Sequence, residues 1–180
     1  MKDIENIKTP ADILDFMDEI DYGYVDVNGE KHIQSLKGIR TLYRTLSIDN
    51  ILKYRIGTCI EQVFLMHYLL DSLGIKNKMF CTRVYESGEV DSEKEEHMHC
   101  FILYYDDEGV HQIEHPNWER KGIYHFKDEQ EAIEKINKIY VEMAAGEARP
   151  VTEFFTVDEG LSFKDFNDYV NSLDEYNLKK

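Results

Sequence analysis

An apolar segment that directly follows a Gly-Thr-Cys tripeptide constrains the fold more than any other part of the sequence. Its apolar residues at positions 63, 66, 70 and 73 have helical spacing, and those at 64, 65 and 69 widen the apolar face. Gly57 and Thr58 precede the segment and Gly74 follows it, and these residue types commonly begin and end helices. A helix with so wide an apolar face needs other elements around it, so we expect it at the centre of a domain.

Cys59 lies at the N-terminal end of this predicted helix. Unpaired backbone N–H groups and the positive end of the helix dipole favour a thiolate there, and the thiolate is the reactive form of cysteine. The other two cysteines, Cys81 and Cys100, fall inside apolar strand-like segments, where a buried thiol is usually inert. Cys59 is therefore the candidate nucleophile.

Two strand-like segments joined by a hairpin turn carry the candidate partners of this thiol. If Tyr105 pairs with Val110 across the turn, Glu114 becomes a diagonal neighbour of His99 on the same face of the sheet. A slip of one residue would place His115 beside His99 and turn Glu114 away. The length of the turn favours the first register, and the second stays open.

Cysteine, histidine and acid, in this order and on these elements, are typical of a nucleophilic thiol site. We expect His99 to act as the base for Cys59 and Glu114 to fix the histidine tautomer and support the imidazolium. His115 and Asn117 are the alternative orienting residues in place of Glu114.

The same strands also permit a metal-site interpretation. His97, His99, Glu114 and His111 resemble the ligand set of cupin barrels, and clustered histidines do bind metals. Cupins, however, are all-β, whereas at least half of this chain is predicted to be helical. We expect no bound metal and no cofactor, and the histidine metal site remains a second alternative.

The rest of the chain predicts helices on both sides of a run of strands. Thr9, Ser47 and Ser162 are expected helix caps. Strands are expected at 22–27, 78–85, 97–105, 110–115 and 122–126, an acidic loop at 86–96, an amphipathic helix at 128–145 and a short linker at 146–150. We predict one α+β domain over residues 1–180, with its core at about 50–126 and a C-terminal helical extension at 128–180.

Composition and charge narrow the classes of partner. The 36 acidic and 21 basic residues give a formal net charge of -15, which repels nucleic acid and anionic membranes. A peptide or protein amide substrate, and a basic one in particular, is compatible with that charge. The three cysteines form no CxxC pair, the first residues show no apolar leader, and no stretch approaches the roughly 18 apolar residues of a membrane span. These features predict a cytoplasmic protein.

Three parts of the sequence resemble the transglutaminase-like superfamily, which has the papain-type cysteine protease fold, and its small bacterial members in particular. Gly57-Thr58-Cys59, with the helix that ends in Leu-Gly-Ile, resembles the family's first motif. His99 before an apolar strand resembles the second, and Glu114 stands where the family usually has aspartate. The resemblance covers residues 50–126 and implies a central helix bearing the cysteine, packed on an antiparallel sheet with flanking helices.

The resemblance implies acyl transfer through a thioester. Cys59 would attack an amide carbonyl, and His99 would take the thiol proton and later protonate the leaving amine. Water as acceptor gives a cysteine peptidase or amidase, and an amine as acceptor gives a transglutaminase-like reaction. The sequence leaves both open. A non-catalytic binding or scaffold module on the same fold is the alternative.

Several further residues are candidates for the walls of this site. The backbone N–H of Cys59 is expected to help hold the oxyanion. Tyr22, Tyr24 and Gln62 are candidates for a second oxyanion donor or a cleft position, on residue type alone. Trp118, which follows the third motif, is a candidate either for core packing or for one wall of a thiol cleft.

Overall fold

The computed structural model describes residues 2–86, 96–144, 146–147 and 150–177, and for 84–86, 96–97, 144 and 146–147 it describes the backbone alone. The helices of the described part are α1 (Pro10–Phe16), α2 (Ile39–Leu42), α3 (Ile48–Tyr54), α4 (Cys59–Ser72), α5 (Glu129–Ala144) and α6 (Phe163–Asn171). The strands are β1 (Asp21–Val25), β2 (Lys31–Ile33), β3 (Ile56–Gly57), β4 (Asn77–Glu86), β5 (Glu96–Asp106), β6 (Gly109–Glu114), β7 (Gly122–Phe126), β8 (Gly146–Glu147) and β9 (Val151–Phe154). The fold is therefore mixed α+β, as predicted.

Local capping signals account for where several helices begin. Thr9, Thr58 and Ser162 each cap a helix in a capping box, in which the side chain of the third helical residue returns to the cap backbone. Ser47 caps α3 through the backbone N–H of Asn50. The predicted caps Thr9, Ser47 and Ser162 are thus confirmed, because capping depends on residues three apart in the sequence.

The described strands form two sheets. The larger sheet has the order β7-β6-β5-β4-β8, with β9 also paired to β4, and all of its pairs are antiparallel. The smaller sheet has the order β2-β1-β3. In the larger sheet Tyr105 pairs with Val110, which is the predicted hairpin register. Pairing between β5 and β6 ends at Ile102 and Ile113, so β6 leaves β5 before the position of His99.

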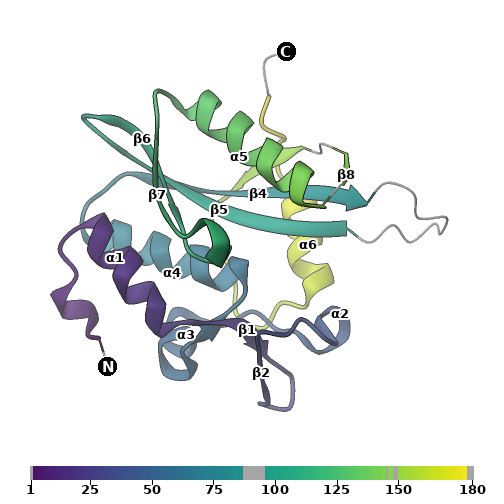
Figure 1. Cartoon of the computed structure of the whole chain (residues 1–180). Coiled ribbons are helices and arrows are strands. Elements are labelled where there is room, and N and C mark those ends of the chain that lie inside the picture. The colour runs from purple at the N-terminus through teal and green to yellow at the C-terminus, as the bar shows by residue number, and fades with distance from the viewer. Residues whose placement is uncertain (1, 87–95, 145, 148–149, 178–180) are drawn as a thin grey trace.

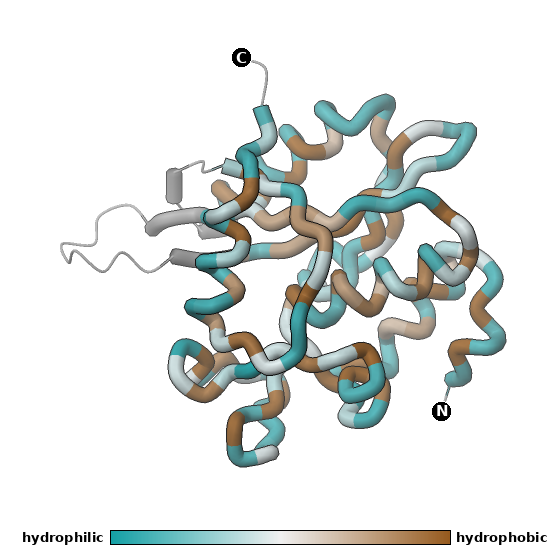
Figure 2. Tube along the Cα trace, turned by 180° about the vertical axis from the view of Figure 1, so that it is seen from behind, coloured by the Kyte–Doolittle hydropathy of each residue, from teal (hydrophilic) through white to brown (hydrophobic). Residues whose placement is uncertain are grey.

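Helices cover both faces of the larger sheet, with α4 and α1 on one side and α5 on the other (Figure 1). Side chains alternate along each strand, so the sheet separates two hydrophobic cores. Cys100 and Ile102 belong to the core shared with α4, whereas Phe101 and Leu103 belong to the core shared with α5. Hydrophobic and hydrophilic residues alternate along much of the trace (Figure 2).

The C-terminal part of the chain contributes more to the sheet than its helical pattern predicts. Strand β8 begins where the linker at 146–150 was expected, and β9 follows it. Strand β9 pairs with β4, from Met79↔Phe154 to Thr82↔Val151. A short strand of this kind is stabilised by its neighbour rather than by its own sequence, so it has no strong local signal. The acidic loop expected at 86–96 lies for the most part outside the described residues.

The helices of the described residues are too short or too polar for a bilayer: none could cross a membrane.

Candidate active site

The first turn of α4 is held by a buried hydrogen-bond network. Thr58 caps the helix, and its backbone N–H and hydroxyl both donate to Oε2 of Glu61, which is 1% exposed. The hydroxyl of Tyr43 donates to the other carboxylate oxygen. Burial raises the pKa of Glu61, while these hydrogen bonds act against that rise. The network fixes the position of Cys59, the first residue of the helix.

Cys59 is 7% exposed and packs against the edge of β5. Its Sγ lies 3.9 Å from the carbonyl oxygen of Met98, within reach of a weak S–H hydrogen bond. Burial and the neighbouring thiols of Cys59 and Cys81 raise the pKa of Cys100, so the three cysteines form one cluster. All three are free. The thiol therefore meets β5 where β6 has already left the ladder.

His99 and Glu114 lie together on the opposite face of the same strand region. Nε2 of His99 is 3.7 Å from Oε1 of Glu114, an ion-pair distance that is too long for a hydrogen bond. The two side chains are diagonal neighbours, as the confirmed register requires. Glu114 is 2% exposed, and the Nε2 atom of His99 is buried with no hydrogen-bond partner in the described residues.

Tyr140 of α5 completes this cluster, and its position in the sequence does not indicate a site residue. Its ring stacks on His99 with 3.6 Å between centroids, and its hydroxyl donates a 2.7 Å hydrogen bond to Oε1 of Glu114. Tyr140 belongs to the predicted apolar face of its helix, where it looked like an ordinary core residue. The spacing of the helix could not reveal that its hydroxyl meets a carboxylate from β6.

Burial favours the neutral forms of both titrating partners. It lowers the pKa of His99 to about 3. It also raises the pKa of Glu114 to about 7, against the lowering effects of the Tyr140 hydroxyl and the Asn117 backbone N–H. The pKa of Tyr140 is raised mainly by burial, then by the neighbouring Glu114 and then by Cys59. The thiol is therefore within electrostatic range of the Tyr140 hydroxyl.

The structure brings His99 and Glu114 together but forms no hydrogen bond between Cys59 and His99 among the described residues. Met98 and Cys100 face the α4 core, and His99, between them, faces α5. Cys59 reaches the strand from the α4 side, next to the residue that precedes His99. Contact between the thiol and the imidazole thus requires the Cys59 side chain to turn around the unpaired edge of β5.

The two alternative orienting residues lie elsewhere. Nδ1 of His115 forms a 2.7 Å hydrogen bond with Oε1 of Gln62, and its Nε2 lies 3.3 Å from Asp18. Burial lowers the pKa of His115, although Asp18 acts in the opposite direction. The side-chain amide of Asn117 donates to Sδ of Met143. Neither side chain contacts His99, and Asn117 acts on Glu114 through its backbone only.

A cavity of about 350 Å³ opens beside the N-terminal turn of α4. Two carboxylates and two amides line it, from Asp18, Asp21, Gln34 and Gln62. Its remaining walls come from Ile20, Tyr22, His115, Pro116 and Trp118. Cys59 does not itself line the cavity. Burial and then Cys59 raise the pKa of Tyr22, so one residue of the cavity wall lies within electrostatic range of the thiol.

Three of the four candidate wall residues, Tyr22, Gln62 and Trp118, line this cavity. Trp118 is 64% exposed, which fits a wall position and excludes core packing. Tyr24 does not line it. Its buried ring stacks on His32 at 4.5 Å, and its hydroxyl donates to the Lys37 carbonyl.

The histidine metal set of the second alternative does not assemble in the described residues. His111 lies on the α4 face with its ring stacked on Tyr104, away from His99 and Glu114. The side chain of His97 lies outside the described residues. Two other groups in the described part bring three metal-binding atoms within 4.8 Å of one another: Asp26-Glu30-His32 and Asp106-Glu108-His111.

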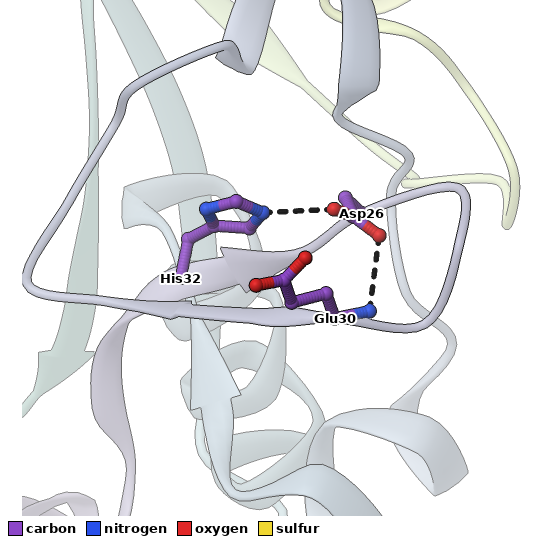
Figure 3. Close-up of side chains that lie close together, drawn as sticks. All are labelled: Asp26, Glu30 and His32. Carbon is purple, nitrogen blue, oxygen red and sulfur yellow. Dashed lines mark hydrogen bonds and ion pairs between the residues drawn. The ribbon is translucent and has the colours of Figure 1, made fainter.

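The first of these groups lies on the β1–β2 hairpin (Figure 3). Asp26 is 2.8 Å from Nε2 of His32 and accepts hydrogen bonds from two backbone N–H groups of the hairpin turn. Both of its carboxylate oxygens therefore already have partners. These hydrogen bonds explain the geometry of the hairpin, and a bound ion is not needed to explain it.

Comparison with known proteins gives no family assignment, since no protein-family model and no curated protein matches the chain.

Proposed function

We propose that the chain is a thiol-dependent acyltransferase or hydrolase with a transglutaminase-like core, acting on an amide or peptide bond. One observation carries the proposal. The Sγ of Cys59 lies against the Met98 carbonyl, and the next residue, His99, lies 3.7 Å from Glu114. A cysteine at a helix N-terminus, a histidine on a strand and a carboxylate on the neighbouring strand supply the groups that thiol catalysis needs.

In the proposed reaction, the Cys59 side chain first turns around the unpaired edge of β5 to meet His99. Cys59 then transfers its proton to His99, and its sulfur attacks the carbonyl carbon of the substrate amide. The C–N bond then breaks, and His99 gives the proton to the leaving amine. The remaining thioester on Cys59 reacts with water to give an acid, or with another amine to give a new amide. The Cys59 N–H lies in the first turn of α4, where N–H groups lack intrahelical acceptors and can hold an oxyanion.

The environment of His99 keeps its imidazole neutral in the resting state. Burial lowers its pKa to about 3, so the imidazole is unprotonated at neutral pH and weakly basic, and it accepts the thiol proton only when an ionised Glu114 stabilises the imidazolium. Glu114, with a pKa of about 7, supplies negative charge beside the imidazolium once it ionises. The substrate would approach from the cavity lined by Tyr22, a residue within electrostatic range of the thiol.

The test is the rate at which iodoacetamide alkylates each cysteine between about pH 5 and about pH 9, mapped by mass spectrometry. Cys81 and Cys100 are completely buried and serve as internal references. We expect Cys59 to react at least about tenfold faster than either. His99→Gln should slow Cys59, whereas His125→Gln, a change at an exposed histidine of β7, should not. Equal, slow reaction of all three cysteines would overturn the proposal.

A second candidate function is binding without chemistry on the same fold. The burial of the thiol favours this binding function, because Cys59 is 7% exposed and forms no hydrogen bond with His99 in the described residues. In that case Cys59→Ala should leave the binding of any co-purifying partner unchanged, and Cys59 should show no enhanced alkylation. Rapid alkylation of Cys59 would contradict this alternative.

A further inference from the structure

The cavity beside α4 combines carboxylates with aromatic rings. Asp18 and Asp21 supply the charge, and Tyr22 and Trp118 supply the rings. Trp118 presents most of its ring to solvent, and it meets His115 edge to face at 5.5 Å between centroids. Carboxylates and exposed aromatic faces together attract organic cations through ion pairing and cation–π contact.

The charge of the cavity is not balanced by its own residues. Asp18 is paired with Lys121 at 2.5 Å and contacts His115. His115 does not contribute a compensating charge at neutral pH, because burial lowers its pKa. The carboxylate of Asp21 is exposed and has no hydrogen-bond or ion-pair partner in the described part of the chain. One negative charge at the cavity is therefore left without a counter-charge.

A cationic residue of the chain itself, Lys121, already contacts the Trp118 ring and the Asp18 carboxylate of this cavity. The ammonium of Lys121 lies 4.7 Å from the centroid of the Trp118 ring while it pairs with Asp18. The same ring and carboxylate thus bind an alkylammonium group by the two interactions that a ligand would use. Asp21, which also lines the cavity, offers a second carboxylate that has no such partner among the described residues.

We propose that this cavity is a binding subsite for the cationic side chain, arginine or lysine, of a peptide ligand. Its placement as a specificity subsite beside Cys59 rests on the proposed function, whereas the binding itself does not. Asp21 accepts hydrogen bonds from the guanidinium or ammonium group, and Trp118 covers it. The formal net charge of -15 draws such ligands toward the protein.

Trp118 makes the test direct, because it is the only tryptophan of the chain. Its fluorescence is titrated in the Cys59→Ala protein, which binds but cannot react. The probes are the Nα-acetyl methylamides of arginine and lysine, with those of citrulline and norleucine as neutral counterparts of similar shape. We expect the charged probes to bind about tenfold more tightly than their neutral counterparts. The ratio of arginine to lysine affinity then shows which cation fits better.

Variants assign the effect to the cavity. Asp21→Asn should reduce the affinity for the arginine probe about tenfold, and Asp107→Asn, at an exposed hairpin position, should not. Asp21 has no side-chain partner to lose, so this variant is expected to fold normally, and circular dichroism checks that. Equal binding of arginine and citrulline, or equal binding by the Asp21 and Asp107 variants, would overturn the subsite.

The two proposals fail separately. Charge-selective binding with an unreactive Cys59 would leave the subsite standing and remove the catalytic role. A reactive Cys59 without charge-selective fluorescence changes would remove the subsite and leave the catalytic role standing.

Discussion

The hydroxyl of Tyr140 donates a 2.7 Å hydrogen bond to Oε1 of Glu114, and that same oxygen lies 3.7 Å from Nε2 of His99. Tyr140 therefore occupies the hydrogen-bonding position that an orienting carboxylate would otherwise offer to the histidine. The tyrosine ring meanwhile holds the imidazole by stacking. In the resting protein the pair is positioned by α5 rather than by a direct hydrogen bond between His99 and Glu114.

Removal of the Tyr140 hydroxyl should lower the unfolding free energy of the protein. Tyr140→Phe keeps the ring stacked on His99 but leaves a buried carboxyl oxygen without its donor, so we expect a loss of about 1–2 kcal/mol in unfolding free energy. Urea denaturation measures it. Tyr68→Phe, at a ring that is 43% exposed, is the matched control and should cost much less. Equal losses for the two variants would show that the hydrogen bond to Glu114 does not matter.

Glu114 should make stability fall as pH rises. Its pKa is raised from 4.5 to about 7 in the folded protein, so the folded state holds a proton that the unfolded state has already released. The destabilisation develops between pH 4.5 and pH 7 and is complete above that window. Glu114→Gln removes it, so the difference in unfolding free energy between variant and parent should grow in the variant's favour across this range. A difference independent of pH would contradict the raised pKa.

His99 should act in the opposite direction at lower pH. Its pKa is lowered from 6.5 to about 3, so the unfolded state binds a proton that the folded state does not. Stability should be lost as pH falls from 6.5 toward 3, and His99→Gln should lose less than the parent over that range. Thermal unfolding in a series of buffers measures the trend, with His125→Gln as control. Parallel curves for the His99 variant and the parent would refute this account.

Gly57 should tolerate no side chain. A Cβ at this position would lie 2.6 Å from Cβ of Glu61, in the capping network below Cys59. We expect Gly57→Ala to cost about 1–3 kcal/mol and to change the alkylation rate of Cys59. Gly160→Ala is the control, because φ is +85° there but no atom lies within 4 Å of the added methyl. This variant should lower the unfolding free energy through backbone strain and leave the alkylation rate of Cys59 unchanged. A Gly57 variant that matches the parent in both measurements would contradict the clash.

Local features of the sequence predicted much of the fold. The caps at Thr9, Ser47 and Ser162 depend on neighbouring residues, and the hairpin register follows from the turn. That register placed Glu114 beside His99 correctly. Strands β2, β3, β8 and β9 were not predicted, because their short sequences become strands only through pairing with β1 and β4.

The remaining features of the site depend on tertiary structure. Which face of β5 is covered by α4 decides that Cys59 meets Met98 and Cys100 while His99 turns toward α5. No local pattern encodes that choice. For the same reason, the contact of Tyr140 with Glu114 and the gathering of Asp18, Asp21 and Trp118 around one cavity could not be read from spacing.

Because the interior is divided into two hydrophobic cores, substitutions in one core can accumulate during evolution without disturbing the other. The thiol sits in the α4 core, whereas the tyrosine that holds the histidine and the glutamate sits in the α5 core. Substitutions on the inner face of α5 can retune proton affinity at His99 and Glu114 while the packing of α4 around Cys59 stays intact. The proposed nucleophile and its proposed acid–base partners are thus open to independent selection within one small chain.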